Sequence, residues 1–176
     1  MPGAVFLRGD GVTLRTVEES DVEFLRDTLN DPEVRARLMT NRPLNRHQER
    51  EYFEERISSD ETVSLMICSD GETVGNVSLS PIDQRAGNCE IGLWVAPDHH
   101  GRGYGTEASR LLTGYAFDEL RMHRVGARVF AHNDASRRIL EKIGFEREGV
   151  HRDEAFTGGE YVDVCYYGVL ADEWDG

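Results

Sequence analysis

The chain is 176 residues long, 39% of them apolar and 30% charged, and carries a formal net charge of −13 at pH 7. This length suits a single domain over residues 1–176. No stretch is apolar enough to cross a bilayer, and residues 1–5 lack the features of a signal peptide. We therefore expect a cytoplasmic protein with no membrane partner. The acidic balance argues against nucleic acid as a main partner, since duplex binding needs clustered Lys and Arg.

The first third of the chain predicts a strand hairpin followed by three helices. Residues 6–15 alternate apolar and polar side chains around an Asp-Gly turn, as an opening hairpin or bent strand does. The helix start signals are a Thr16/Glu19 capping box, the pair Asp31–Pro32, and Asn45 with Gln48. The predicted inward faces are Val22, Leu25 and Leu29 for the first helix, Val34 and Leu38 for the second, and Tyr52, Phe53 and Ile57 for the third.

After residue 60 the apolar period changes from that of a helix to that of a strand. The predicted elements are strands at 63–69, 73–80 and 89–95, a helix at 104–120, a strand at 124–131, a helix at 133–144, and strands at 145–156 and 161–170. A polar connector is expected over 81–88. This order indicates a single α/β domain of the α+β type, with helices flanking a mixed sheet that is mostly antiparallel and turns parallel near residue 100.

Positive charge is almost entirely arginine, since Lys142 is the single lysine. High acidity with little lysine suits a halophilic protein, because salt screens the repulsion between carboxylates. A GC-rich genome, which favours arginine codons, explains the same composition equally well.

Cysteine and histidine show neither a disulfide nor a metal pattern. Cys68, Cys89 and Cys165 are isolated in apolar runs, which favours buried small hydrophobic residues over a disulfide framework. His99 and His100 are adjacent and so point apart, and no His-x-x-x-His spacing with a carboxylate occurs. We therefore expect no metal site.

The most informative stretch is the glycine-rich turn His100-Gly101-Arg102-Gly103-Tyr104-Gly105, which follows an apolar strand and precedes a long helix. Glycines let the backbone approach a ligand closely, and the first amides of a helix have no partners within it and lie at its positive end. Such a turn binds a phosphate group. A P-loop is excluded because no lysine lies near, and the dinucleotide fingerprint is excluded because the glycines fall at 101, 103 and 105.

This turn resembles the pyrophosphate loop of the GCN5-related N-acetyltransferases (GNAT), whose pattern is Gln/Arg-x-x-Gly-x-Gly/Ala. The segment 133–145, Leu14-Arg15 near the start, and the ending 163–170 with Glu173-Trp174 look like the branch that acetylates ribosomal-protein N-termini, the Rim type. The resemblance covers essentially the whole chain. It implies the acyl-CoA N-acyltransferase fold, acetyl-CoA as cosubstrate, and an amine acceptor, and it leaves a monomer or a homodimer open.

Two positions depart from the family pattern. His100 stands where most members have Gln or Arg, although its backbone and its imidazole can still donate to phosphate. Leu140 stands where many members have a tyrosine in the last helix that protonates the leaving thiolate. The role of that tyrosine therefore has no counterpart here.

The resemblance also implies which residues contact CoA. The expected cofactor-binding residues are Leu93, Trp94, Val95, His100, Gly101, Arg102, Gly103, Tyr104, Gly105, Thr106, Asn133 and Arg138. The two arginines suit the CoA phosphates, and a backbone amide of the strand that ends at Val95 is expected to stabilise the thioester carbonyl oxygen. Asn133 is expected to bond to the pantetheine arm; a pure helix cap is the other interpretation. Trp94, Tyr52 and Phe53 are expected in the core rather than in an acceptor pocket.

Two side chains are candidates for the chemistry. Glu90 is our candidate base, directly or through water, although its position in a strand equally suits a solvated carboxylate. Ser136 is the candidate to stabilise the leaving thiolate, with helix capping as its alternative. An α-amino group, with a pKa near 7.7–8.0, needs only modest help from a base, whereas a lysine side chain near 10.4 needs more.

The function predicted from the sequence is transfer of an acetyl group from acetyl-CoA to a primary amine. A protein N-terminus is the expected acceptor, and a small amine such as a polyamine or an antibiotic is the rival. A CoA-binding module without turnover is an alternative of another class, because Leu140 replaces the usual acid.

Overall fold

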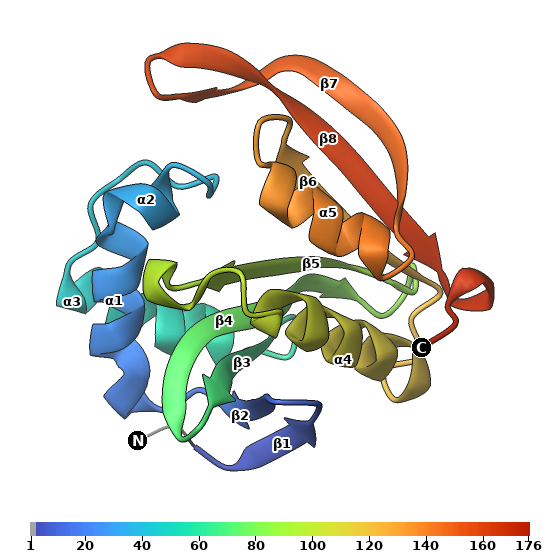
Figure 1. The fold of residues 1–176 in the computed structure, drawn as a ribbon. Coiled ribbons are helices and arrows are strands. Elements are labelled where there is room, and N and C mark those ends of the chain that lie inside the picture. The colour runs from blue at the N-terminus through green and yellow to red at the C-terminus, as the bar shows by residue number, and fades with distance from the viewer. Residues whose placement is uncertain (1–2) are drawn as a thin grey trace.

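The computed structural model describes residues 3–176 and forms one eight-stranded sheet with helices on both faces (Figure 1). Along the sheet the strands lie in the order β1-β2-β3-β4-β5-β6-β8-β7. The strands are β1 (Val5–Arg8), β2 (Thr13–Thr16), β3 (Val63–Ser69), β4 (Glu72–Asp83), β5 (Asn88–Val95), β6 (Arg124–Phe130), β7 (Glu146–Thr157) and β8 (Glu160–Leu170). The α-helices are α1 (Val22–Asn30), α2 (Pro32–Arg35), α3 (Arg46–Tyr52), α4 (Tyr104–Asp118) and α5 (Asp134–Lys142).

Every neighbouring pair of strands is antiparallel except β5 and β6, which run parallel. A tight turn at Asp70 and Gly71 joins β3 and β4 into an antiparallel hairpin. Both residues have the positive φ that such a turn requires, 50° and 84°. The parallel pair needs a crossover, and α4 supplies it. The mixed sheet predicted from the sequence is thus confirmed, with its parallel step between β5 and β6, the two strands that precede and follow the glycine turn and α4 along the chain.

The helices start largely where the sequence signals place them. Asp31 caps α2, and Asn45 and Gln48 form the reciprocal capping box of α3. The predicted Thr16/Glu19 capping box is wrong, because Thr16 is the last residue of β2 and its hydroxyl donates to Glu18. The chain instead makes a short 3-10 turn at Glu19–Asp21, in which the Asp21 carboxylate accepts from the Glu18 amide, before α1 begins.

The third helix differs most from its predicted packing. Its buried residue is Glu49, which is 2% exposed, whereas Tyr52 is 49% exposed and Phe53 and Ile57 are half-buried. The helix winds into a π-turn over Phe53–Ile57, which shifts the side chains away from a regular 3.6-residue period. Burial raises the pKa of the Glu49 carboxyl above its usual value.

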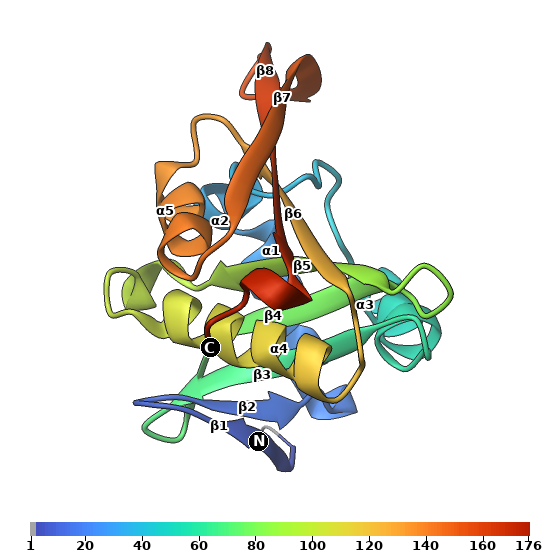
Figure 2. The ribbon, with the colours of Figure 1, turned by 90° about the vertical axis from the view of Figure 1, so that its right-hand side faces the viewer.

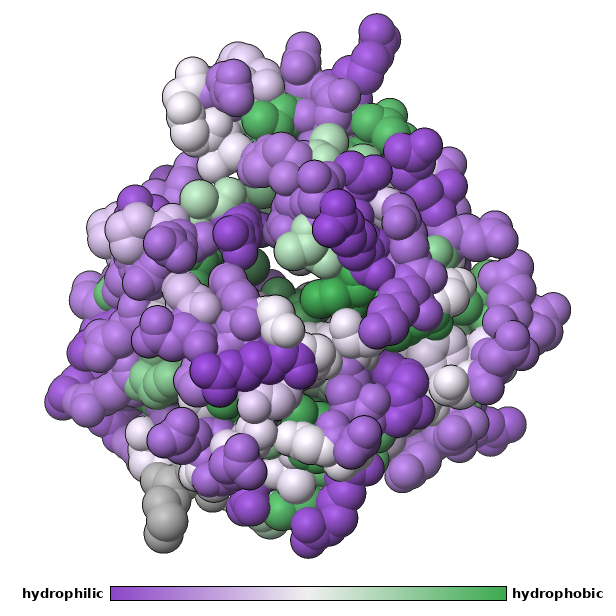
Figure 3. Space-filling model, viewed as in Figure 1, coloured by the Kyte–Doolittle hydropathy of each residue, from purple (hydrophilic) through white to green (hydrophobic). Residues whose placement is uncertain are grey.

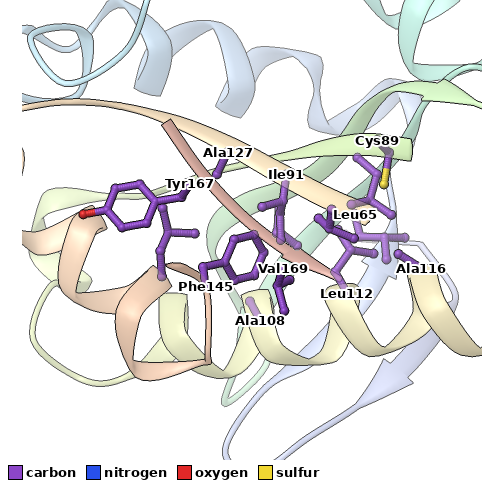
Figure 4. Close-up of a cluster of buried hydrophobic side chains, with 14 of the residues drawn as sticks. Leu65, Cys89, Ile91, Ala108, Leu112, Ala116, Ala127, Phe145, Tyr167 and Val169 are labelled. Atoms are coloured by element: carbon purple, nitrogen blue, oxygen red, sulfur yellow. The ribbon is translucent and has the colours of Figure 1, made fainter. Parts of the chain in front are cut away.

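The main core lies between α4, α5 and one face of the sheet (Figure 4). Leu112 of α4, Leu79 of β4 and Tyr167 of β8 are among its most buried members. A smaller cluster on the other face packs Leu25 of α1 against Met66 and Cys68 of β3. Alternate residues of β3 therefore face opposite layers, as the period of a strand dictates.

Two further features shape the site. The expected polar connector over 81–88 is shorter than predicted, because β4 continues to Asp83 and buries Ile82. At the other end of the sheet the long β7–β8 hairpin projects away from the body, which Figure 2 shows edge-on. No helix within residues 3–176 has the length and apolar character needed to cross a membrane.

Candidate active site

The site begins where β5 and β6 separate. These strands pair only over three positions, Asn88 with Arg124, Cys89 with Val125 and Glu90 with Gly126. Beyond Glu90 the edge of β5 that faces β6 makes no ladder with it, while the other edge remains paired to β4 up to Val95. The backbone groups along this edge need partners, so the gap between the strands suits an extended ligand that carries amides of its own.

The glycine turn closes one end of this gap. Gly101 and Gly103 have φ of 74° and 83°, and a Cβ built on either would meet no atom within 4 Å. Gly103 immediately precedes α4 and has no side chain with which to cap it, so the first amides of the helix are open to an anion. Gly105 serves packing instead: a Cβ there would lie 3.0 Å from Leu93 and 3.1 Å from Ile139.

A cavity of about 490 Å³ occupies this region, and in the space-filling view a hollow partly lined by hydrophobic residues opens on this face (Figure 3). Most of the predicted cofactor-binding residues line it: Leu93, Trp94, Val95, His100, Gly101, Arg102, Gly103, Tyr104, Gly105, Thr106 and Asn133. Ser136 lines it as well. Arg138 and Glu90 are not part of the lining; Arg138 is exposed on α5.

Sequence reasoning missed one wall of the cavity. Val34, Arg37 and Leu38 reach it from α2 and the loop that follows, although they lie more than 50 residues before the glycine turn. His99, Ala135 and Ile139 complete the lining. Ile139 follows from the helix period once Ser136 is placed there, whereas no local signal indicates the contribution of α2.

His100 links the two sides of the cavity mouth. Its Nε2 lies 2.7 Å from the carbonyl oxygen of Val95, which can only accept, so this nitrogen carries a proton. Its Nδ1 lies 3.4 Å from a guanidinium nitrogen of Arg37. The ring is therefore engaged by protein groups, and the backbone of the turn is what remains free for a phosphate.

The start of α5 supplies polar groups from the opposite side. Asn133 is 8% exposed and caps the helix, its Oδ1 accepting from the backbone amide of Ser136 at 3.2 Å. This cap leaves the Asn133 amide nitrogen and the Ser136 hydroxyl, both of residues that line the cavity, for other partners. Leu140, one helical turn after Ser136, is 2% exposed within the core and has no polar atom to offer the site.

Glu90 lies on β5 just where the strands separate. Its Oε2 accepts from Nε of Arg128 on β6 at 2.9 Å, and the two side chains are 40% and 45% exposed. Arg128 also interacts with Tyr166 of β8, whose hydroxyl donates to Glu154 at 2.6 Å. A continuous row of polar side chains thus crosses β5, β6, β8 and β7 on the sheet face opposite α4.

Cys89 precedes Glu90 and is 3% exposed. Burial, with a smaller contribution from the Glu90 charge, raises the pKa of its thiol to about 12. The other two cysteines, Cys68 and Cys165, are also buried. Across residues 3–176 no three His, Cys, Asp or Glu side chains are arranged to hold a metal ion. None of the three thiols lines the cavity beside the glycine turn.

A second cavity of about 410 Å³ lies next to the first. It is formed by residues 38–41 of the loop after α2, by β6, and by the β7–β8 hairpin. Leu38 lines both cavities, so they meet at this side chain.

A parallel strand pair that splays beside a glycine turn at a helix start offers backbone groups and helix amides to a long, anionic ligand. The family model described as the acetyltransferase (GNAT) domain matches residues 12–146. The chain belongs to the GNAT acetyltransferase family. It is therefore an enzyme, an acetyl-CoA-dependent N-acetyltransferase, as predicted, rather than a CoA-binding module without turnover.

Individual relatives differ in what they act on. YdaF of Bacillus subtilis, provisionally named a ribosomal N-acetyltransferase, is 41% identical over 107 residues, which are 61% of this chain and 58% of YdaF. The spermidine N(1)-acetyltransferase of Escherichia coli K12 is 26% identical over 89% of this chain and 86% of its own. A structure of spermidine N-acetyltransferase from Vibrio cholerae with CoA and spermine matches with a TM-score of 0.89, covering 94% of this chain and 98% of that one. At 22% identity that likeness shows the fold alone.

Proposed function

We propose that this enzyme acetylates the α-amino group of a protein N-terminus, as the ribosomal, Rim-type branch does. The support is the similarity to YdaF together with the Rim-like segment 133–145, whose Asn133 and Ser136 line the cavity beside the glycine turn. The second cavity adds the observation that carries the proposal. It opens beside the first and gives room for the acceptor chain behind its reactive amine.

The residues of the first cavity fit CoA. The open backbone of Gly101, Gly103 and the first turn of α4 suits the pyrophosphate, and the edge of β5 from Leu93 to Val95, which makes no ladder with β6, suits the pantetheine amides. Arg102 lines the cavity, and within residues 3–176 its side chain bonds only to the carbonyl oxygen of Asp98, at 3.3 Å, which leaves its other donors for phosphate. Arg138, exposed on α5 outside the lining, is proposed as an outer phosphate contact.

Three groups of the chain would assist the reaction. Acetyl-CoA supplies the activated acyl group. Glu90 takes the amine proton through water, because its carboxylate lies at the separation of β5 and β6 but outside the cavity lining. A backbone amide of β5 stabilises the carbonyl oxygen, and the Ser136 hydroxyl donates to the departing thiolate sulfur, which Leu140 cannot do.

A polyamine acceptor is the second candidate, favoured by the 26% identity to the E. coli spermidine enzyme over most of both chains. The net charge of −13 also suits a cationic acceptor, although a halophilic surface explains the same charge.

Thiol release from acetyl-CoA separates the two candidates. We expect peptides with free N-termini to be acetylated with a kcat/KM at least tenfold above that of spermidine. The control is the same peptides with blocked N-termini and one internal lysine, which should react poorly. If spermidine is acetylated and none of the peptides is, the proposal is contradicted.

The base is tested separately. Glu90→Gln should lower kcat by about 10- to 100-fold and alter the pH profile of kcat. Glu72→Gln, which changes an exposed carboxylate at the far turn of β4, is the matched control. An unaltered profile and turnover in Glu90→Gln would remove Glu90 from the mechanism.

A further inference from the structure

The second cavity has two walls that come from distant parts of the chain. One is the loop after α2, which contributes Leu38 and Met39, and the other is the end of β7, which contributes Phe156. Its floor includes Phe130 of β6 and Val164 of β8, which are register partners in the sheet. An acceptor whose amine reaches the first cavity past Leu38 therefore has its following atoms in the second.

Two apolar side chains of this cavity are open to solvent. Met39 is 51% exposed and Phe156 is 56% exposed, although both are large and hydrophobic. Each faces the cavity from a different wall, so a side chain placed between them would bury apolar surface on both. Exposed apolar side chains that gather around a cavity mark a place where a ligand binds.

The charged groups of the cavity already have partners within the protein. Arg128 is paired with Glu90 at 2.9 Å. Glu154 accepts from the Tyr166 hydroxyl at 2.6 Å and lies 3.3 Å from Nδ1 of His151. Six of the eleven lining residues are apolar and five are polar or charged, with Glu154 as the one carboxylate. A polyamine carries further cations beyond its reacting amine, and the lining offers them this single carboxylate, which already has partners.

We propose that the second cavity holds the first side chain of a peptide acceptor and selects an apolar one, with Met39 and Phe156 as specificity-determining residues. The inference rests on the proposed N-terminal acetylation and goes beyond it by naming the class of first residue. A side chain such as Leu or Met would lie between the two walls, whereas Gly would leave both exposed.

Peptides that differ only in their first residue test this selection. With the unaltered enzyme, kcat/KM for a Leu or Met first residue should exceed that for Gly by at least tenfold, the usual effect of apolar groups in a matching pocket. Phe156→Ala should reduce this ratio about tenfold by lowering the kcat/KM for the Leu or Met peptide. Because Phe156 is more than half exposed at the end of the hairpin, the variant should fold.

The facing strand provides a matched control. Tyr161 of β8 stacks edge-on against Phe156 with ring centroids 5.0 Å apart and is 68% exposed, but it does not line the cavity. Tyr161→Ala should keep the preference. Peptide acetylation with the same first-residue preference in the parent and in Phe156→Ala would overturn this inference while leaving the proposed function intact. If the enzyme acetylates spermidine but none of the peptides, both this inference and the proposed function are overturned.

Discussion

Gly103→Glu tests the anion site at the start of α4 most sharply. The residue has a φ of 83°, so any side chain there adopts a left-handed backbone at a cost of about 1–2 kcal/mol. The new side chain would meet no atom of the protein within 4 Å at its Cβ and would extend into open space beside the helix start. The substitution therefore brings a negative charge to the place proposed for the pyrophosphate without disturbing the core.

The magnitude follows from Coulomb's law. Two unit charges about 5 Å apart, at an effective dielectric constant of about 20, repel by roughly 3 kcal/mol. That corresponds to an increase in the Kd of CoA of about a hundredfold. Backbone strain should lower the Tm by about 2–8 °C, since each kcal/mol shifts the Tm of a protein of this size by about 2–4 °C.

Gly71 provides the control for strain and charge. Its φ of 84° is nearly the same, a Cβ there also meets no atom within 4 Å, and it lies in the turn between β3 and β4, outside the lining of the cavity. By isothermal titration calorimetry, Gly71→Glu should bind CoA as the parent does, with a similar loss of Tm. A Kd for Gly103→Glu within threefold of the parent value would refute the assignment of this turn to the pyrophosphate.

Three further predictions concern other parts of the site and the core. Ser136→Ala should lower kcat by about 10- to 100-fold. The Kd of CoA should stay the same, because Asn133 caps α5 through the backbone amide of residue 136, which the substitution keeps. An unchanged kcat would exclude a role of the Ser136 hydroxyl in thiolate release. Burial raises the pKa of the Glu49 carboxyl in the folded protein above its value in the unfolded chain. The contribution of this carboxyl to the free energy of unfolding is therefore fully present at pH values below its pKa in the unfolded chain, and it is lost as the pH rises through its pKa in the folded protein. Glu49→Gln should therefore raise the free energy of unfolding at pH 8 and leave it nearly unchanged near pH 4, and urea unfolding that shows no gain at pH 8 would contradict this. Cys89, 3% exposed with a pKa of about 12, should resist iodoacetamide at pH 8 until the protein is unfolded, and rapid labelling of the folded enzyme would show that the thiol is accessible.

Most of the fold could be predicted because its signals are local. The period of apolar residues distinguishes helices from strands, and the turn at Asp70-Gly71 and the cap at Asn45 lie where the structure has them. The errors also have local causes. Thr16 resembles a helix cap but ends a strand, and the π-turn after Tyr52 shifts the face that the third helix buries.

The site could be predicted only in part. The glycine turn and the start of α5 were placed at the cavity because each carries a motif that is continuous in sequence. The wall made by Arg37 and Leu38 was missed, since α2 has no motif and reaches the cavity only through tertiary packing. The partner of Glu90 was missed for the same reason, because Arg128 lies 38 residues further along the chain and meets it only across the sheet.

A crystal structure with CoA linked through an acetyl group to the N-terminus of a short peptide would test the account most directly. The account predicts the pyrophosphate on the amides of residues 101–106, the pantetheine along the free edge of β5, and the first side chain of the peptide between Met39 and Phe156. A complex in which the peptide leaves by another route, or in which the pyrophosphate lies away from the glycine turn, would contradict it.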